Sequence, residues 1–322
     1  MTAMAAAQAA RLAWAAGVVF HTGDHPLPQG SFWAQWDPRL DATLVLLLAG
    51  GAYSLGWWRL RRAGHARLAT GWRLAAYGSG LAVTAFSLMG PVDVLQELLF
   101  AIHMVQHLLL RLVAAPLIIL AAPFPIALWG LPPRARRAVG QALAPATPSR
   151  RALERATSPW LLLTVHLATI WLWHTPAGYN GALRNPWVHD VQHITFFATA
   201  LAFWWCTAAA EPTLQPRLGY GLRLALVLMA LFQTQILSII IAMAERPLYD
   251  FYTTVPRLWG MSVMDDQRWS GVIMWVPGGL WYVMTAVLLL ERMMSRQERI
   301  VRRRGALTAV PAPALLGDPP TA

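Results

Sequence analysis

The sequence predicts an all-α membrane protein, a bundle of about seven transmembrane helices with its N-terminus outside and its C-terminus in the cytoplasm. Of the 322 residues, 57% are hydrophobic and 13% are charged, and the mean hydropathy of +0.43 is too high for an ordinary soluble domain. The apolar residues are grouped in segments of about 20, the length that a helix needs to cross a bilayer. Most of the chain is therefore expected to lie in lipid.

Composition also excludes several classes of function. The net charge of +11 is distributed between the apolar segments, so it does not indicate a nucleic-acid-binding domain. The single cysteine, Cys206, excludes a disulfide framework and a CxxC metal or redox motif. The sequence has no glycine-rich phosphate loop, no GxSxG elbow and no nucleophile or acid–base pair in a water-filled site. We therefore do not predict an enzyme.

The first 40 residues form a separate segment. Residues 1–20 are rich in alanine with Arg11 in the middle, which favours a signal-like or interfacial helix over a span. Residues 21–40 are rich in Pro, Gly and Trp and are predicted to lie extended at the outer membrane surface. We expect this whole segment to be periplasmic.

The transmembrane domain is predicted over residues 41–295. Its seven apolar segments are residues 41–58, 72–90, 95–116, 159–176, 187–208, 222–244 and 269–291. Ser158-Pro159 and Asn185-Pro186 each pair an N-cap residue with a proline in the first turn, which predicts helix starts there.

One further apolar piece, residues 117–129, is interrupted by Pro123 and Pro125. It is interpreted as the tail of the third helix or a partly inserted segment, because proline disrupts a continuing helix.

The arginines give the orientation. Residues 59–73, 130–158 and 209–223, with the C-terminal tail, hold nineteen arginines and five acidic residues. The opposite side holds six arginines and ten acidic residues. The positive-inside rule therefore places the first set in the cytoplasm. The tail itself, residues 296–322, is expected to be disordered.

Two pairs of histidines are the main functional signal. His103 and His107 lie four residues apart in the third segment, and His189 and His193 repeat that spacing in the fifth. Residues i and i+4 share one face of a helix, so each pair points in one direction. An ionisable side chain in a membrane is costly and marks a functional site.

Other side chains of ligand type gather at the same predicted outer side. His174 ends the fourth segment, so five of the nine histidines converge there. Asp266 and Gln267 begin the seventh helix, and Met274 follows seven residues after Gln267 on the same face. Simpler roles are open to three of them: His174 as a helix-to-helix hydrogen-bond partner, Asp266 as a helix cap and Met274 as a packing residue.

Two nearby residues are treated separately. His166 lies near mid-bilayer in the fourth segment, away from the cluster, and is left unassigned. Arg111 follows His107 by four residues, and its long side chain is expected to reach the inner headgroups.

Several chemistries fit such a cluster. Imidazole and thioether ligands suit Cu(I), and neutral imidazole also suits Zn(II) and Cu(II). Haem is the main alternative, because His103 or His107 together with His189 or His193 could supply both axial ligands. A proton or ion carrier would need carboxylates deep in the spans, whereas every acidic residue here falls at a helix end or in a loop.

Five motifs resemble one family over about residues 33–295. They are His103-Met104-Val105-Gln106-His107, Trp173-His174-Thr175-Pro176, the run NPWVHDVQH at residues 185–193, Arg246-Pro247-Leu248-Tyr249, and Asp265-Asp266-Gln267 followed by WVPGG at residues 275–279. Together they are similar to the CtaG-like family of cytochrome c oxidase assembly proteins. Arg111 departs from this resemblance, since an apolar or small residue is expected there.

The resemblance implies a multi-pass protein of the bacterial inner membrane that is needed to assemble haem-copper oxidase. It also implies handling of copper for the oxidase subunit that carries the buried copper centre, with a periplasmic copper donor as a second partner. The Trp-rich outer segment around Trp33 and Trp36 is a candidate docking segment for that subunit.

We therefore predict a non-enzymatic assembly factor that receives Cu(I) at its outer face. The predicted ligands are His103, His107, His189 and His193, with His174 and Met274 as auxiliary ligands and Asp266 and Gln267 orienting the imidazoles. The alternatives are a b-type haem protein that transfers electrons and a metal-free assembly scaffold.

Overall fold

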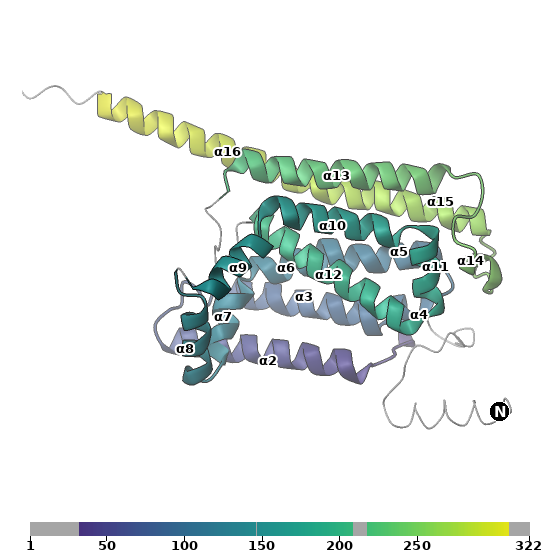
Figure 1. The fold of residues 1–322 in the computed structure, drawn as a ribbon, viewed down its shortest axis with the longest axis horizontal. Helices are drawn as coiled ribbons and strands as arrows, with labels where there is room; N and C mark the ends of the chain where they lie inside the picture. Colours follow the sequence, from purple (N-terminus) through teal and green to yellow (C-terminus); the bar gives the residue numbers. More distant parts are fainter. Residues whose placement is uncertain (1–31, 146, 209–217, 309–322) are drawn as a thin grey trace, which may run out of the picture.

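A computed structural model describes residues 32–145, 147–208 and 218–308 of the chain. All regular secondary structure in these residues is helical, which confirms the all-α prediction (Figure 1). The predicted helix over residues 1–20 and most of the extended segment after it lie outside the described residues.

The first part of the chain forms two long helices and a short one. α2 and α3 correspond to the first two predicted segments, and α4 follows α3 at a sharp bend after Gly90. The described elements are η1 Phe32–Ala34, α2 Leu40–Arg62, α3 Gly71–Met89 and α4 Pro91–Leu95.

The third predicted segment is a continuous rod with a π-helical middle. It consists of α5 Phe100–Leu108, the π-helix η2 Leu109–Ala114 and α6 Ala115–Leu120. The chain then turns at Ala122, whose φ of 52° is left-handed, and enters α7 Pro123–Gly130. Residues 117–129 are thus divided: the first part ends the rod, and the second forms a helix of its own.

α7 packs very closely against α2. A Cβ atom built on Gly56 of α2 would overlap the backbone oxygen of Ile126, and one on Gly130 would overlap that of Ala52. Only glycine permits such an approach of two backbones. α7 is therefore held against the bundle.

The second part of the chain completes the bundle. α10 and α12 begin at Pro159 and Pro186, as the cap and proline signals predict. The described elements are α8 Pro133–Ala142, α9 Pro148–Ala156, α10 Pro159–Trp173, α11 Pro176–Arg184, α12 Pro186–Ala208, α13 Tyr220–Met243, α14 Phe251–Thr254, α15 Val263–Ile273, the π-helix η3 Met274–Gly278 and α16 Gly279–Thr308.

One expectation for the tail is wrong. Residues 296–308 were expected to be disordered, but they continue α16 to Thr308 and project beyond the bundle (Figure 1). This stretch contains no proline, and five of its thirteen residues are arginine, which favours helix.

Within the part of the chain that the structure describes, five helical stretches are long and apolar enough to cross a membrane. They are Leu40–Arg62, Gly71–Leu95, Phe100–Leu120, Tyr220–Met243 and Val263–Arg302. α10 is a shorter apolar helix of 15 residues. α12 has 23 residues, and its first turns carry polar side chains. The chain is a multi-pass membrane protein, while the count of seven spans stays a prediction.

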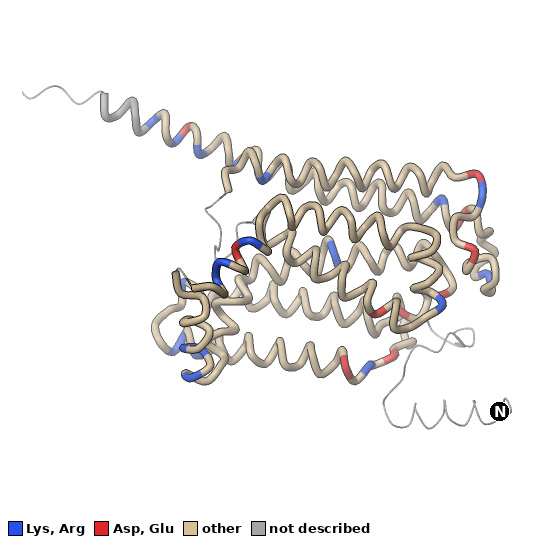
Figure 2. The backbone as a smooth tube through the Cα atoms, in the orientation of Figure 1, with Lys and Arg blue, Asp and Glu red and all other residues tan. Residues whose placement is uncertain are grey.

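The charged residues separate along the bundle. Arginines gather at the end formed by α8, α9 and the far part of α16, and most acidic residues lie at the opposite end (Figures 1 and 2). The first end is the one predicted to face the cytoplasm. The histidines discussed below lie in the half of α5 and α12 near the acidic end.

Candidate metal centre

The helix that carries the first histidine pair is anchored at its N-terminus by Asp266. The carboxylate accepts hydrogen bonds from the backbone N–H groups of Phe100 at 3.0 Å and Ala101 at 2.9 Å. It also pairs with Arg257 at 2.9 Å. The first N–H groups of a helix lack partners within it, and their dipoles favour an anion. Asp266, at the start of α15, thus caps α5 rather than contacting an imidazole.

His103 makes a hydrogen bond that fixes its tautomer. The Tyr252 hydroxyl donates to the backbone oxygen of Gln96 at 2.9 Å. Because a hydroxyl has only one hydrogen, it must accept from His103 Nδ1, which lies 3.1 Å away. The neutral His103 ring therefore has its lone pair on Nε2. A metal ligand needs such a lone pair.

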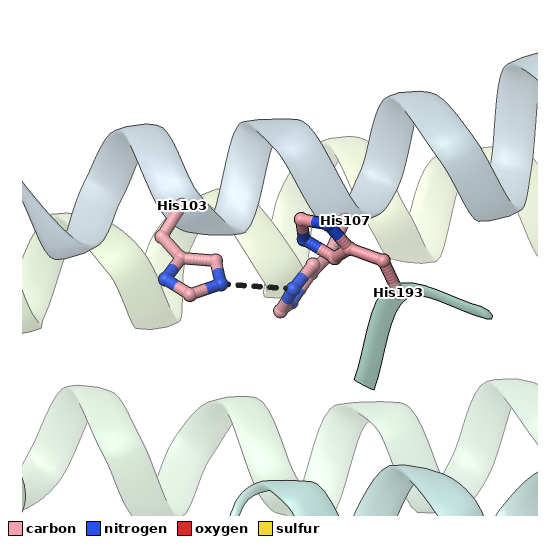
Figure 3. A group of neighbouring side chains, drawn as sticks. All are labelled: His103, His107 and His193. Atoms are coloured by element: carbon pink, nitrogen blue, oxygen red, sulfur yellow. Dashed lines mark hydrogen bonds between the residues drawn. The ribbon is translucent and has the colours of Figure 1, made fainter. Parts of the chain in front are cut away.

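The lone pair of His103 faces two other imidazoles (Figure 3). His107 Nε2 lies 2.9 Å from His103 Nε2. Ligand atoms of His103 and His107 on α5 and of His193 on α12 all lie within 4.8 Å of one another. The three side chains are 0%, 2% and 6% exposed. Two helices far apart in the sequence thus supply one buried set of nitrogen donors.

The remaining two predicted histidines border this set. The ring centroid of His189 is 4.2 Å from that of His193 and 5.4 Å from that of His103. His174, the C-cap of α10, lies 6.5 Å from His107. Its Nδ1 donates to the backbone oxygen of Ile170 at 2.7 Å. Its buried Nε2 therefore has the lone pair and has no hydrogen-bond partner.

The other predicted residues lie outside the imidazole cluster. Met274, in η3, belongs to a buried apolar group that includes Phe100, Met104 and Phe196. Gln267 accepts a hydrogen bond from the Leu248 N–H at 2.7 Å and donates to the Arg246 oxygen at 3.2 Å. It thereby fixes the segment between α13 and α14. The roles predicted for these residues as auxiliary ligand and orienting group stay predictions.

The sequence analysis did not identify three tyrosines that border the cluster, Tyr179, Tyr249 and Tyr252. Tyr252 orients His103, and the Tyr179 ring lies 5.0 Å from it. The Tyr249 hydroxyl donates to the His174 backbone oxygen at 2.9 Å. These tyrosines come from α11 and the region around α14, outside the long apolar segments. The nearest available signal was Tyr249 within the Arg-Pro-Leu-Tyr motif.

Sequence reasoning also missed a buried carboxylate beneath α5. Gln106 donates from Nε2 to Asp93 Oδ1 and to the Ser87 oxygen, both at 2.7 Å. Both Asp93 and Asp266 are at helix ends, as expected, yet both are buried. Asp93 links α5 to α4, and Asp266 links α5 to α15. Carboxylates therefore fix the histidine helix in place without joining its cluster.

The expectation for Arg111 is wrong. Its side chain is 3% exposed, and its guanidinium carbon lies 5.2 Å from the centre of the Phe196 ring within the bundle. It does not reach the headgroups, because the π-helical turn η2 packs between α3 and α12. His166 lies apart from the cluster and stacks on Phe203 at 4.7 Å.

Two of the pockets formed by described residues border the cluster. A cavity of about 280 Å³ between α2, α3 and α12 has His193 in its wall and the Arg39–Asp190 ion pair beside it. A smaller pocket of about 30 Å³, lined by Gln96, Glu97 and Arg184, reaches His189. The imidazoles are thus buried but close to two surface openings.

The donors present fit a metal ion. Two nitrogen ligands at about 2.0–2.1 Å from a tetrahedral metal lie roughly 3.3 Å apart, close to the 2.9 Å between the two Nε2 atoms. His174 Nε2, which has no hydrogen-bond partner, is a further buried nitrogen with a lone pair, and its ring centroid lies 6.5 Å from that of His107. A cation between His103 and His107 would replace their hydrogen bond and leave the His107 hydrogen on Nδ1.

Comparison with known proteins points to one family. Uncharacterized proteins of Mycobacterium bovis and Mycobacterium tuberculosis are each 26% identical over 281 residues, which cover 84% of this chain and 40% of theirs. This chain thus spans about two fifths of the length of these relatives. No solved structure matches it. The family described as cytochrome c oxidase caa3 assembly factor matches residues 51–296, and the chain belongs to that family.

Proposed function

We propose that this protein assembles cytochrome c oxidase by holding a copper ion and passing it to the oxidase subunit that carries the buried copper centre. The supporting observation is the set of three buried imidazoles, His103, His107 and His193, whose ligand atoms lie within 4.8 Å of one another. Neutral nitrogen donors without a carboxylate suit Cu(I) better than hard divalent ions such as Mg²⁺ or Ca²⁺.

The surrounding histidines favour transfer over permanent storage. His189 and His174 lie within ring contact of the three donors, so a bound ion has more candidate ligands than Cu(I) requires. An ion in such a cluster can exchange one ligand at a time. The cavity beside His193 and the pocket at His189 are the proposed routes by which a periplasmic copper donor and the oxidase reach the cluster.

The packing favours a metal ion over haem. His103 and His193 have ring centroids 6.2 Å apart, a separation that two axial ligands of one iron would show. The His107 ring, however, lies 4.3 Å from the first and 5.4 Å from the second, in space that a porphyrin plane would need. Haem would therefore require the cluster to open.

The proposed setting is the bacterial inner membrane, with seven spans and the histidine cluster in the periplasmic half. The separation of arginines from acidic residues along the bundle supports that orientation (Figure 2). Trp33 and Trp36 are 70% and 53% exposed beside the same end. Large exposed aromatic side chains are common at protein interfaces, so this segment is the proposed docking surface for the oxidase subunit.

The decisive experiment measures anaerobic Cu(I) binding by chelator competition on the detergent-purified full chain, together with an optical spectrum. The His103→Ala/His107→Ala double variant should lose binding. His166→Ala is the matched control, because it also removes a buried histidine, and it should bind like wild type. Equal binding by both variants would disprove the cluster as the site. A Soret band would favour the haem alternative, and absence of metal and haem would favour the scaffold.

A cellular measurement separates assembly from simple metal binding. Cells that express His107→Ala should contain inserted protein at wild-type levels but oxidase deficient in copper. The control is again His166→Ala, which should support oxidase with normal copper content. Normal copper in the oxidase of the His107 variant would contradict copper transfer.

A further inference from the structure

A buried positive charge, the guanidinium of Arg111, lies close to the histidine cluster. Arg111 is 3% exposed, and its Nε and Nη2 atoms have no hydrogen-bond partner. No ion pair among residues 32–145, 147–208 and 218–308 includes it. A buried guanidinium stays protonated, since arginine cannot be deprotonated in proteins. Its charge is therefore fixed and uncompensated by a carboxylate.

The Arg111 guanidinium and two histidines of the cluster contact the same aromatic ring, that of Phe196. Arg111 lies 5.2 Å from the centre of Phe196, and the same ring lies 4.7 Å from His107 and 6.0 Å from His174. Solvent and salt screen charges buried in a protein much less than charges at its surface, so a charge near the cluster acts more strongly than an exposed one. A cation held by the imidazoles would experience this charge.

We propose that Arg111 makes the histidine cluster selective for a monovalent cation, Cu(I), over divalent ions. This inference rests on the proposed copper function and assigns the charge state of the cargo. Repulsion by one fixed charge acts twice as strongly on a divalent ion as on a monovalent one. The imidazoles are neutral, and the nearby carboxylates Asp93 and Asp266 are engaged in capping and linking α5, so the cluster itself offers no compensation.

The size of the effect follows from Coulomb's law. Arg111 and His107 lie 5.2 Å and 4.7 Å from the centre of the same Phe196 ring, so the guanidinium carbon is at most about 10 Å from the His107 ring centroid. At that separation and an effective dielectric constant of about 20, one additional unit of charge changes an affinity by roughly 10-fold or more. Neutral imidazole alone binds Zn(II) and Cu(II) well. A cluster of histidines without a counteracting charge would therefore trap these ions. Arg111 also weakens Cu(I) binding, which favours release to the oxidase.

A purely structural role for Arg111 is the competing explanation. Its backbone oxygen accepts a hydrogen bond from the Trp204 indole at 2.8 Å, and its guanidinium covers Phe196. The backbone hydrogen bond is kept in any Arg111 variant, whereas loss of the guanidinium contact with Phe196 would change stability. That loss would not change the ratio of Cu(I) to divalent affinity, and that ratio is therefore the readout.

The test compares wild type, Arg111→Gln and Arg111→Lys as detergent-purified full chains. Cu(I) affinity is measured anaerobically by chelator competition, and Zn(II) affinity by competition with a fluorescent chelator. The glutamine variant should shift the ratio toward Zn(II) by roughly 10-fold or more. The lysine variant keeps a charge and should stay nearer the wild-type ratio. Arg111→Met is a second variant without charge, and replacing a buried ion with an apolar side chain is often tolerated.

The possible results are distinct. Wild type that binds Cu(I) at the histidines, combined with an unchanged ratio in both charge-free variants, would overturn the selectivity role and leave the proposed function intact. Wild type that binds no metal would overturn both. A shift of the ratio in the glutamine or methionine variant but not in the lysine variant would support the inference.

Discussion

Arg39 and Asp190 form an ion pair, Nη1 to Oδ1 at 2.5 Å and Nη2 to Oδ2 at 2.9 Å, that joins the start of α2 to the α12 turn between His189 and His193. The pair lines the cavity of about 280 Å³ that reaches His193. Bidentate pairing of arginine with a carboxylate is geometrically specific. The two residues thus hold α2 against the helix that supplies half of the cluster.

Breaking this pair should open the cavity. Asp190→Asn is expected to speed the extraction of bound Cu(I) by a chelator several-fold while leaving equilibrium affinity near the wild-type value, since no imidazole is altered. Stopped-flow chelator competition measures the rate. Asp41→Asn is the control, because Asp41 binds the same arginine but is largely exposed. Equal rates for both variants would contradict a gating role for Asp190.

Tyr252→Phe should weaken metal binding without removing a ligand. The hydroxyl accepts from His103 Nδ1 and so keeps the lone pair on Nε2. Loss of such an orienting partner typically lowers metal affinity by roughly 10- to 100-fold. Cu(I) affinity is the measurement. Tyr53→Phe is the control, since it also removes a buried hydroxyl that is hydrogen-bonded, in that case to the Ala121 oxygen. Matching losses would refute a specific role for Tyr252.

Asp266→Ala should lower the free energy of unfolding far more than Asp265→Ala does. Asp266 is 1% exposed, caps α5 and pairs with Arg257, so its loss should cost about 3 kcal/mol in free energy of unfolding. The side chain of Asp265 is 55% exposed; it pairs with Arg268 at 3.4 Å and accepts a hydrogen bond from the Ser262 hydroxyl at 2.6 Å. Both contacts are exposed, so its loss should cost less than about 1 kcal/mol. Denaturant unfolding in detergent tests this, and comparable losses would show that the cap is unimportant.

Gly56→Ala should separate α7 from α2. A Cβ at this position overlaps the Ile126 backbone oxygen, and overpacking of this kind costs about 1–3 kcal/mol. Gly51→Ala on the same helix is the control, because a Cβ there meets nothing within 4 Å. That change should be neutral or slightly stabilising, since alanine favours helix. Thermal unfolding is the measurement; tolerance of alanine at Gly56 would mean that the helices can move apart.

Much of the architecture could be predicted because it depends on local properties. A bilayer requires apolar helices of about 20 residues, and proline after a capping residue fixes where a helix starts. Both α10 and α12 begin where this rule predicts. The i, i+4 spacing likewise guarantees that His103 and His107 share a face whatever surrounds their helix. The helical periodicity alone sets that relationship.

The contacts between helices could not be predicted in the same way. Helix periodicity gives directions around one axis but not the rotation or depth of one helix against another. Asp266 could be read as a cap, yet the helix that it caps, α5, begins more than 160 residues earlier in the sequence. Tyr252 lies in the short helix α14, and Gln267 fixes the segment that leads into it through hydrogen bonds with Leu248 and Arg246.

Sequence alone therefore determined the helical membrane fold and identified two pairs of histidines as candidate ligands. Tertiary structure decided that His193 meets His103 and His107, and that Arg111 turns inward onto Phe196. The physical reason is that a buried side chain takes its environment from whichever helix packs against it. Local rules for arginine near a membrane predict contact with the headgroups, but they apply only where the side chain has a path to the interface.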